Sequence, residues 1–163
     1  MKNCIKLVGI IALMAVMVFT FAACGNSGTG DQTSPGGGVA KSLRITGMDS
    51  FNGATGEVYL MTSKVTDEIA GDFFWKMMLG ETATPQELAM FPAGGIGIVS
   101  GGVLEMSLKK TVQSGVGTVD WTGSGKHGVL IILGYDIYGP KGNRYLNFNS
   151  QVTTDTFSNY TKD

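Results

Sequence analysis

Cysteine, histidine and charge are all scarce in this chain. Its 163 residues include two cysteines and one histidine, and only 15% of them are charged. Cys4 lies in an apolar N-terminal segment, so Cys24 has no second cysteine in the rest of the sequence, and a disulfide within a folded domain is excluded. His127 alone cannot supply the usual zinc ligands, and no calcium-loop motif occurs. We therefore expect no metal and no cofactor.

Concentrated positive charge is also lacking. The chain has 12 basic and 13 acidic residues, and Lys109-Lys110 is its only adjacent pair of lysines or arginines. Without a basic patch, a protein does not produce the electrostatic field that attracts nucleic acid or anionic lipid headgroups. We therefore expect that nucleic acid is not a partner.

The N-terminus has the organisation of an export signal. Residues 1–6 carry two lysines, and residues 7–19 are uncharged and mainly aliphatic. A phenylalanine and two alanines then precede Cys24. This sequence resembles the lipobox, at which bacterial lipoprotein precursors are diacylated on the cysteine and cleaved before it, although phenylalanine replaces the usual leucine. An ordinary secretory cleavage site, or an uncleaved membrane helix over residues 5–23, also fits the composition. The abrupt change to glycine and polar residues after Cys24 favours lipoprotein processing.

These features divide the chain into three parts. Residues 1–23 are the predicted lipoprotein signal peptide, residues 24–40 a flexible tether rich in glycine and serine, and residues 41–163 an all-β domain. The tether cannot bury enough apolar surface to offset its ordering entropy. A flexible chain of this length spans roughly 20 Å. A lipid on Cys24 would therefore hold the domain close to a membrane.

The pattern of the domain predicts β-structure. The strongest strand covers residues 127–135, where a continuous apolar run at 129–133 suits the centre of a sheet. Residues 96–99 and 103–108 flank a Ser-Gly-Gly turn and predict a hairpin, and Asn52-Gly53 predicts a further turn. Short strands separated by turns predict an antiparallel β-sandwich or a small β-barrel of about seven to eight strands, with at most one short helix.

The interval from residue 66 to 91 is less regular. Phe73-Phe74-Trp75 is compatible with a strand. Thr84 is a good N-cap, followed by a proline at the first helical position and a glutamate, Glu87, three residues after the cap. This spacing predicts one short helix beginning at Thr84.

No motif in the domain predicts catalysis. Residues 123–128 match the spacing of a phosphate-binding glycine loop, but we expect a strand rather than a helix after them. His127 is expected in an exposed loop, because no nucleophile motif accompanies it. Asp67, Glu68 and Asp72 could serve a glycosidase only if a cleft made two of them face each other. We therefore expect that the protein is not an enzyme.

Aromatic residues are the best candidates for a binding surface. Flat rings carry much of the contact energy with sugars and partner proteins, and Trp75, Trp121, Tyr135, Tyr138 and Tyr145 are the candidates here. We predict that most of them are buried. Trp121, Tyr135 and Tyr138 are the predicted ligand or partner surface, with the two tyrosines, near a loop, the best placed.

Several short motifs are similar to small lipoproteins encoded in multiple copies by host-associated spirochaetes. They are LRITG at 43–47, the Asn52-Gly53 turn, WTGSG at 121–125 before an apolar strand, and YLNF at 145–148. Spirochaetal lipoboxes are permissive and would accommodate the phenylalanine before Cys24. The resemblance implies an envelope or surface location and a non-enzymatic role, and it supplies no catalytic residue.

The sequence thus leads to one functional expectation and two alternatives. We expect a non-enzymatic lipoprotein of the bacterial cell envelope, anchored by lipid on Cys24 and located at the outer membrane or cell surface. Its domain would act as a binding or interaction module, with a protein or a glycan as ligand. The alternatives are a small envelope glycan hydrolase and a purely structural lipoprotein.

Overall fold

The computed structural model describes residues 38–63, 65–142 and 144–162. The predicted signal peptide, Cys24 and most of the predicted tether lie outside these residues. Within the described part of the chain, no helix is long and apolar enough to cross a membrane. Lys41 is the first buried residue after residue 37, and its backbone N–H donates to the carbonyl of Trp121 at 3.1 Å. The chain therefore joins the folded domain at Lys41.

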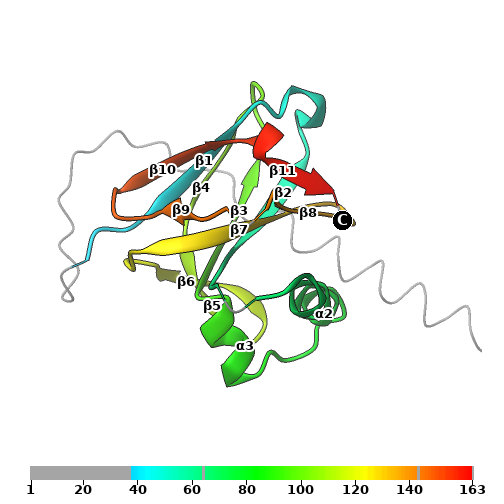
Figure 1. The fold of residues 1–163 in the computed structure, drawn as a ribbon, viewed down its shortest axis with the longest axis vertical. Helices are drawn as coiled ribbons and strands as arrows, with labels where there is room; N and C mark the ends of the chain where they lie inside the picture. Colours follow the sequence, from blue (N-terminus) through cyan, green and yellow to red (C-terminus); the bar gives the residue numbers. More distant parts are fainter. Residues whose placement is uncertain (1–37, 64, 143, 163) are drawn as a thin grey trace, which may run out of the picture. The chain divides into compact units, whose positions relative to one another are not determined.

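Two β-sheets pack face to face in this domain (Figure 1), so the prediction of an all-β fold is confirmed, and of the two predicted forms, sandwich and small barrel, the structure has the sandwich. Neighbouring strands are antiparallel, except that β1 and β10 pair in parallel. The small sheet has the order β10 (Val152–Thr156), β1 (Ser42–Thr46), β4 (Leu104–Ser107). The large sheet has the order β11 (Tyr160–Lys162), β8 (Asp136–Pro140), β7 (Lys126–Leu133), β2 (Thr55–Met61), β3 (Ala93–Ile98), β5 (Lys109–Val112), β6 (Gly115–Asp120), and β9 (Leu146–Asn147) pairs with the start of β7.

The central strand β7 is buried on both faces. Successive side chains of a strand point to opposite faces. Val129, Ile131 and Leu133 accordingly pack in the core between the two sheets. Leu130 and Ile132 belong to a second apolar cluster on the outer face of the large sheet, which helices α2 (Asp67–Met78) and α3 (Pro85–Met90) cover (Figure 1). The predicted central position of this apolar run is confirmed, because β7 pairs with both β2 and β8.

The chain crosses between the sheets through a tight glycine turn after β3. Gly101 and Gly102 both have positive φ, and the residues on either side of them form an isolated bridge. The strand before the bridge, β3, belongs to the large sheet, and the strand after it, β4, belongs to the small one. The predicted turn is therefore present, but its two strands diverge and do not form a hairpin ladder. Glycine in β3 permits this close crossing, because a Cβ on Gly95 would lie 2.7 Å from Met106 Cγ and 3.0 Å from the Ser107 carbonyl.

Two short 3-10 helices complete the elements of the domain. The helix η1 (Asp49–Phe51) lies between β1 and β2, and η2 (Phe157–Asn159) lies between β10 and β11. Phe51 and Phe157 pack edge to face with ring centroids 5.2 Å apart, so the two helices meet through their aromatic side chains. The predicted Asn52-Gly53 turn follows η1, and Gly53 has a φ of 85°.

The helices occupy the interval that the sequence left unsettled. The predicted helix at Thr84 is confirmed as α3: the Thr84 side chain accepts from the Glu87 N–H at 3.3 Å, and Glu87 accepts from the Thr84 N–H at 2.7 Å. The longer helix α2 is a finding of the structure, in a segment where a strand was considered. Its buried residues Ala70, Phe73 and Phe74 are spaced to share one helical face.

Candidate functional site

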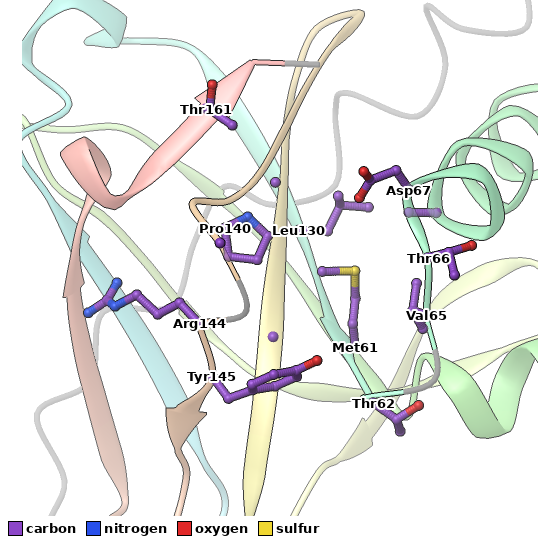
Figure 2. Close-up of a pocket in the computed structure, with 14 residues that line it drawn as sticks. Met61, Thr62, Val65, Thr66, Asp67, Leu130, Pro140, Arg144, Tyr145 and Thr161 are labelled. Carbon is purple, nitrogen blue, oxygen red and sulfur yellow. The ribbon is translucent and has the colours of Figure 1, made fainter.

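A pocket of about 320 Å³ lies on the outer face of the large sheet, beside the N-terminal end of α2 (Figure 2). Met61 of β2 and Leu130 of β7 are among its apolar lining residues. The start of α2 forms one side, and the segment that follows β8, including Tyr145, forms the other (Figure 2). The pocket therefore combines an apolar base of sheet residues with walls from two separate connections.

Polar groups surround this apolar base. Thr66 and Asp67 line the pocket from the start of α2, and Thr161 lines it from β11 (Figure 2). The Thr66 hydroxyl also caps α2, accepting from the Ile69 N–H at 3.4 Å. Asp67 is exposed to solvent. The pocket can thus offer hydroxyl and carboxylate groups to a ligand that rests on the apolar base.

A glycine keeps the base of the pocket open beside an aromatic ring. Gly128 of β7 pairs with Met61 across the β2–β7 ladder. A Cβ on Gly128 would lie 3.3 Å from Met61 Cε and 3.7 Å from Tyr145 Cε1. Tyr145 keeps 37% of its surface exposed. A side chain at position 128 would therefore occupy space next to the exposed tyrosine ring.

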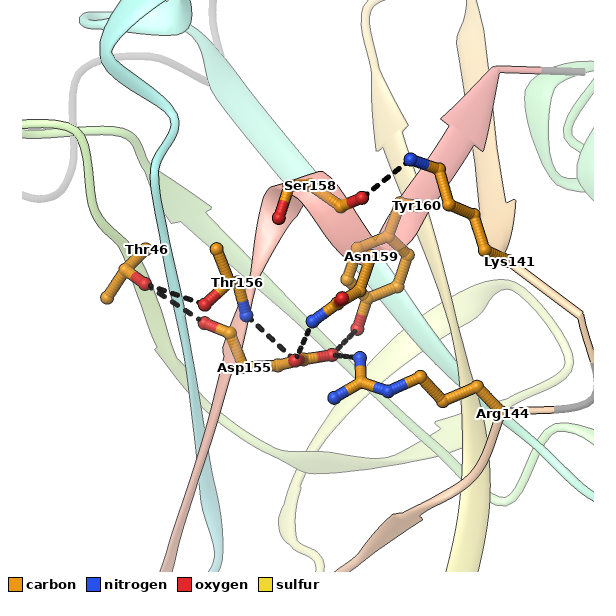
Figure 3. Close-up of polar contacts among 8 residues, drawn as sticks. All are labelled: Thr46, Lys141, Arg144, Asp155, Thr156, Ser158, Asn159 and Tyr160. Atoms are coloured by element: carbon orange, nitrogen blue, oxygen red, sulfur yellow. Dashed lines mark hydrogen bonds and ion pairs between the residues drawn. The ribbon is translucent and has the colours of Figure 1, made fainter.

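Arg144, another pocket residue, is held by a buried carboxylate (Figure 3). Its guanidinium forms an ion pair with Asp155, which is 5% exposed. Asp155 also accepts hydrogen bonds from the Tyr160 hydroxyl, the Asn159 side-chain amide and the Thr156 N–H, each at 2.8 Å. This network fixes the segment after β8 against β10 and β11, and so supports one wall of the pocket.

The same network shifts the pKa values of its members. Burial alone would raise the pKa of Asp155, but hydrogen bonds from Arg144, Thr156, Tyr160 and Asn159 together hold it below the ordinary carboxyl value. Burial, reinforced by Asp155, raises the pKa of the Tyr160 hydroxyl. Asp155 is therefore ionised at neutral pH and Tyr160 is a neutral donor to it.

A second hollow, of about 260 Å³, lies at the other end of α2. Its lining includes Met77 and Met78 of α2 and Ile96 of β3. Within it the Tyr59 hydroxyl donates to Glu57, and burial, together with that carboxylate, raises the pKa of Tyr59. Large apolar side chains stay exposed around this end of the helix and on β3: Trp75, Met78, Leu79, Ile96 and Ile98.

The three aromatic residues predicted as a surface have different environments. Trp121 is a correction: it is only 6% exposed and packs edge to face on His127 and Phe148, so its ring is in the core rather than at the surface. Tyr135 is 80% exposed in the turn between β7 and β8. Tyr138 is half-buried and packs on aromatic residues of η1 and η2. The three rings do not form one surface, and Tyr135 alone is fully presented to solvent.

The residues considered for catalysis are not brought together. Asp67, Glu68 and Asp72 are exposed along α2, and Asp67 is the only carboxylate among the described residues that line the 320 Å³ pocket. The facing pair that a glycosidase requires is therefore not formed by these three residues. His127 is half-buried at the start of β7 rather than in an exposed loop, and its Nε2 lies 3.2 Å from the Ser124 carbonyl.

The glycine-rich segment at 123–128 leads directly into β7, as predicted, so no helix N-terminus receives a phosphate there. Among the described residues, no group of three His, Cys, Asp or Glu side chains could hold a metal ion. Cys24, the predicted lipid attachment site, lies outside the described residues.

No protein-family model, curated protein or solved structure matched this chain.

Proposed function

We propose that this chain is a lipid-anchored protein of the bacterial cell envelope whose domain is a non-enzymatic binding module. One observation carries the second half of this proposal: the 320 Å³ pocket can accept a ligand, but the described residues that line it include no facing acid and base. Its only carboxylate among the described residues is Asp67, and its only cationic side chain there, Arg144, already pairs with Asp155. Such a site can bind and orient a molecule without reacting with it.

The first half of the proposal is supported by the sequence. A positive start, an aliphatic run, a lipobox-like sequence and a polar tether precede the domain. The resemblance to small spirochaetal lipoproteins agrees with the same location, at the outer membrane or cell surface. Anchoring would bring the pocket to a membrane surface and raise the local concentration of any ligand attached to that surface.

Cysteine substitution tests the anchor directly. Cys24→Ala should abolish metabolic labelling of the protein with palmitate and release it from the membrane fraction, because the acyl acceptor is lost. Cys4→Ala is the matched control, since it removes a cysteine from the same chain but leaves the lipobox-like sequence intact. Globomycin, which blocks lipoprotein signal peptidase, should cause a longer precursor to accumulate.

The result that would reject the anchor is equally clear. If Cys24→Ala is still labelled, processed and retained in the membrane as the native chain is, lipid on Cys24 does not hold the protein. Loss of label from Cys4→Ala as well would show that the N-terminal segment, rather than Cys24, is what labelling depends on.

A further inference from the structure

We propose that the pocket at the N-terminal end of α2 binds one or two sugar rings of a neutral saccharide, with Tyr145 as the stacking platform. The inference rests on the proposed function and names the ligand class of the same pocket. Its volume of about 320 Å³ is at the lower end of the roughly 300–1,000 Å³ typical of small-molecule sites. A ligand larger than two rings would extend beyond the pocket.

The tyrosine supplies the first requirement of a saccharide site. A sugar ring has an apolar face of C–H groups, which packs well on an exposed aromatic ring. Tyr145 is 37% exposed, and Gly128 places no side chain beside its ring, where a Cβ would lie 3.7 Å from Tyr145 Cε1 and 3.3 Å from Met61 Cε. The Tyr145 ring is therefore exposed to solvent, and its neighbour at position 128 has no side chain that could cover it.

The rim supplies the second requirement. Sugar hydroxyls project from the edge of the ring and need donors and acceptors around it. Thr66 and Asp67 stand on the side of the pocket across from Tyr145, and Thr161 lines it from β11 (Figure 2). A sugar stacked on Tyr145 would thus have its edge directed toward hydroxyl and carboxylate groups.

The electrostatics argue against charged ligands. The pocket's one cationic side chain among the described residues, Arg144, is paired with the buried Asp155, so its charge is already compensated and attracts a phosphate or carboxylate less strongly than a lone arginine would. Asp67 lies in the first turn of α2, where the partial positive charge of the helix end offsets part of its charge. Its attraction for an organic cation is reduced accordingly, which leaves a neutral polyhydroxy ligand as the best match.

Binding of defined glycosides to the full-length protein tests this inference. The protein is purified in a detergent without a sugar headgroup and titrated with methyl glycosides of glucose, galactose, mannose and N-acetylglucosamine, and with the β-linked disaccharides of glucose and N-acetylglucosamine. Saturation-transfer NMR reads out the binding and identifies the sugar face nearest the protein. We expect saturable binding of at least one glycoside, with the strongest transfer to C–H groups on one ring face.

Three variants and one control locate the site. Tyr145→Ala should weaken binding at least about tenfold, because the platform is lost, whereas Tyr145→Trp should retain it. Gly128→Ala should also weaken binding, since its Cβ narrows the space beside the ring while only the flexible end of Met61 has to move. Tyr135→Ala, which removes an exposed tyrosine outside the pocket, is the control and should leave the affinity unchanged.

Each other outcome overturns a specific part of the proposal. If no glycoside binds, or if choline or inorganic phosphate binds in their place, the ligand class is wrong. If a glycoside binds but Tyr145→Ala and Gly128→Ala keep full affinity, the pocket is wrong. Cleavage of a disaccharide would instead contradict the non-enzymatic role, and palmitate labelling of Cys24→Ala would contradict the anchor. Failure of the proposed function can therefore be distinguished from failure of the saccharide inference.

Discussion

Asp155 shows how much of this structure depends on a single buried charge. Its carboxylate accepts hydrogen bonds from the Thr156 N–H, the Asn159 side-chain amide and the Tyr160 hydroxyl. It also forms an ion pair with Arg144, and so connects all four residues. Leaving a buried donor without an acceptor costs about 1–3 kcal/mol, and the Tyr160 hydroxyl is such a donor. The carboxylate is therefore important both for stability and for the position of the pocket wall that carries Arg144.

We predict that Asp155→Asn lowers the free energy of unfolding by about 1–3 kcal/mol at pH 7, because the ion pair is lost and an amide replaces a charged acceptor. Urea denaturation measures the change. Asp136→Asn is the matched control: its ion pair with Lys162 is exposed on both sides, so the midpoint should barely move. Equal losses from the two variants would contradict the assigned role of Asp155.

The lowered pKa of Asp155 also fixes the pH dependence of this contribution. A carboxyl group whose pKa is lower in the folded protein stabilises it fully above the ordinary carboxyl pKa, and this stabilisation is lost as the pH falls through the folded-state value. The difference in stability between the native chain and Asp155→Asn should therefore shrink as the pH is lowered from 5 toward 2. A difference that stays constant over this range would show that folding does not lower the pKa of Asp155.

At the level of elements, some glycines are required because the structure leaves no room for a Cβ, whereas others could be replaced by alanine. Gly95 in β3 faces Met106 and the carbonyl of Ser107 of β4 at distances too short for a Cβ unless β4 shifts. Apart from its chain neighbours and the backbone of its own helix, Gly71 in α2 has no atom within 4 Å of the position that a Cβ would take. The same substitution should consequently have opposite effects at the two positions.

We predict that Gly71→Ala stabilises the protein by roughly 0.5–1 kcal/mol, because alanine has the higher helix propensity and nothing obstructs it. Gly95→Ala should destabilise it by about 1–3 kcal/mol, since β4 must move away from β3 to admit the methyl group. Thermal unfolding of both variants, followed by circular dichroism, gives the two signs. Stabilisation by Gly95→Ala would mean that the sheets do not approach each other as closely as described.

The helices mark the limit of prediction from local patterns. The capping residues Thr84 and Glu87 identified α3, because that signal lies within four consecutive residues. α2 had a comparable signal in the N-cap Thr66 and in the helical spacing of Ala70, Phe73 and Phe74. Three adjacent aromatic residues favour a strand when they are considered alone, and this local preference obscured the longer period.

At the scale of the whole molecule, the two central strands should be the most stable part. β2 and β7 share six paired positions and lie between the core of the sandwich and the layer of helices. In hydrogen exchange, the backbone amides of these strands should exchange most slowly, with rates set by global unfolding. The amides of α3, a helix of six residues at the surface, should exchange much faster. Similar protection of α3 and β7 would contradict this order.

The pocket could not be predicted from the sequence, because only the complete fold brings its residues together. Its residues come from β2, α2, β7, β8 and β11 and from the segment before β9, which are far apart in the chain. Asp67 and Tyr145 were each recognisable as a candidate by residue type. Nothing in the local pattern around either residue indicates that the fold places both at one pocket, whereas Tyr135, beside a predicted strand end, was correctly expected near the surface.

The burial of β7 on both faces has a consequence for how its pairing is specified. In most strands a slip by one residue turns apolar side chains toward water, and this penalty selects the correct register. Here both faces are apolar, so polarity gives little discrimination. The sizes of the paired side chains select the register instead. Gly56 faces Leu133 at one end of the β2–β7 ladder, and Gly128 faces Met61 at the other. Substitutions that reverse these size differences are those from which we expect misregistered pairing and aggregation, even when every residue involved stays hydrophobic.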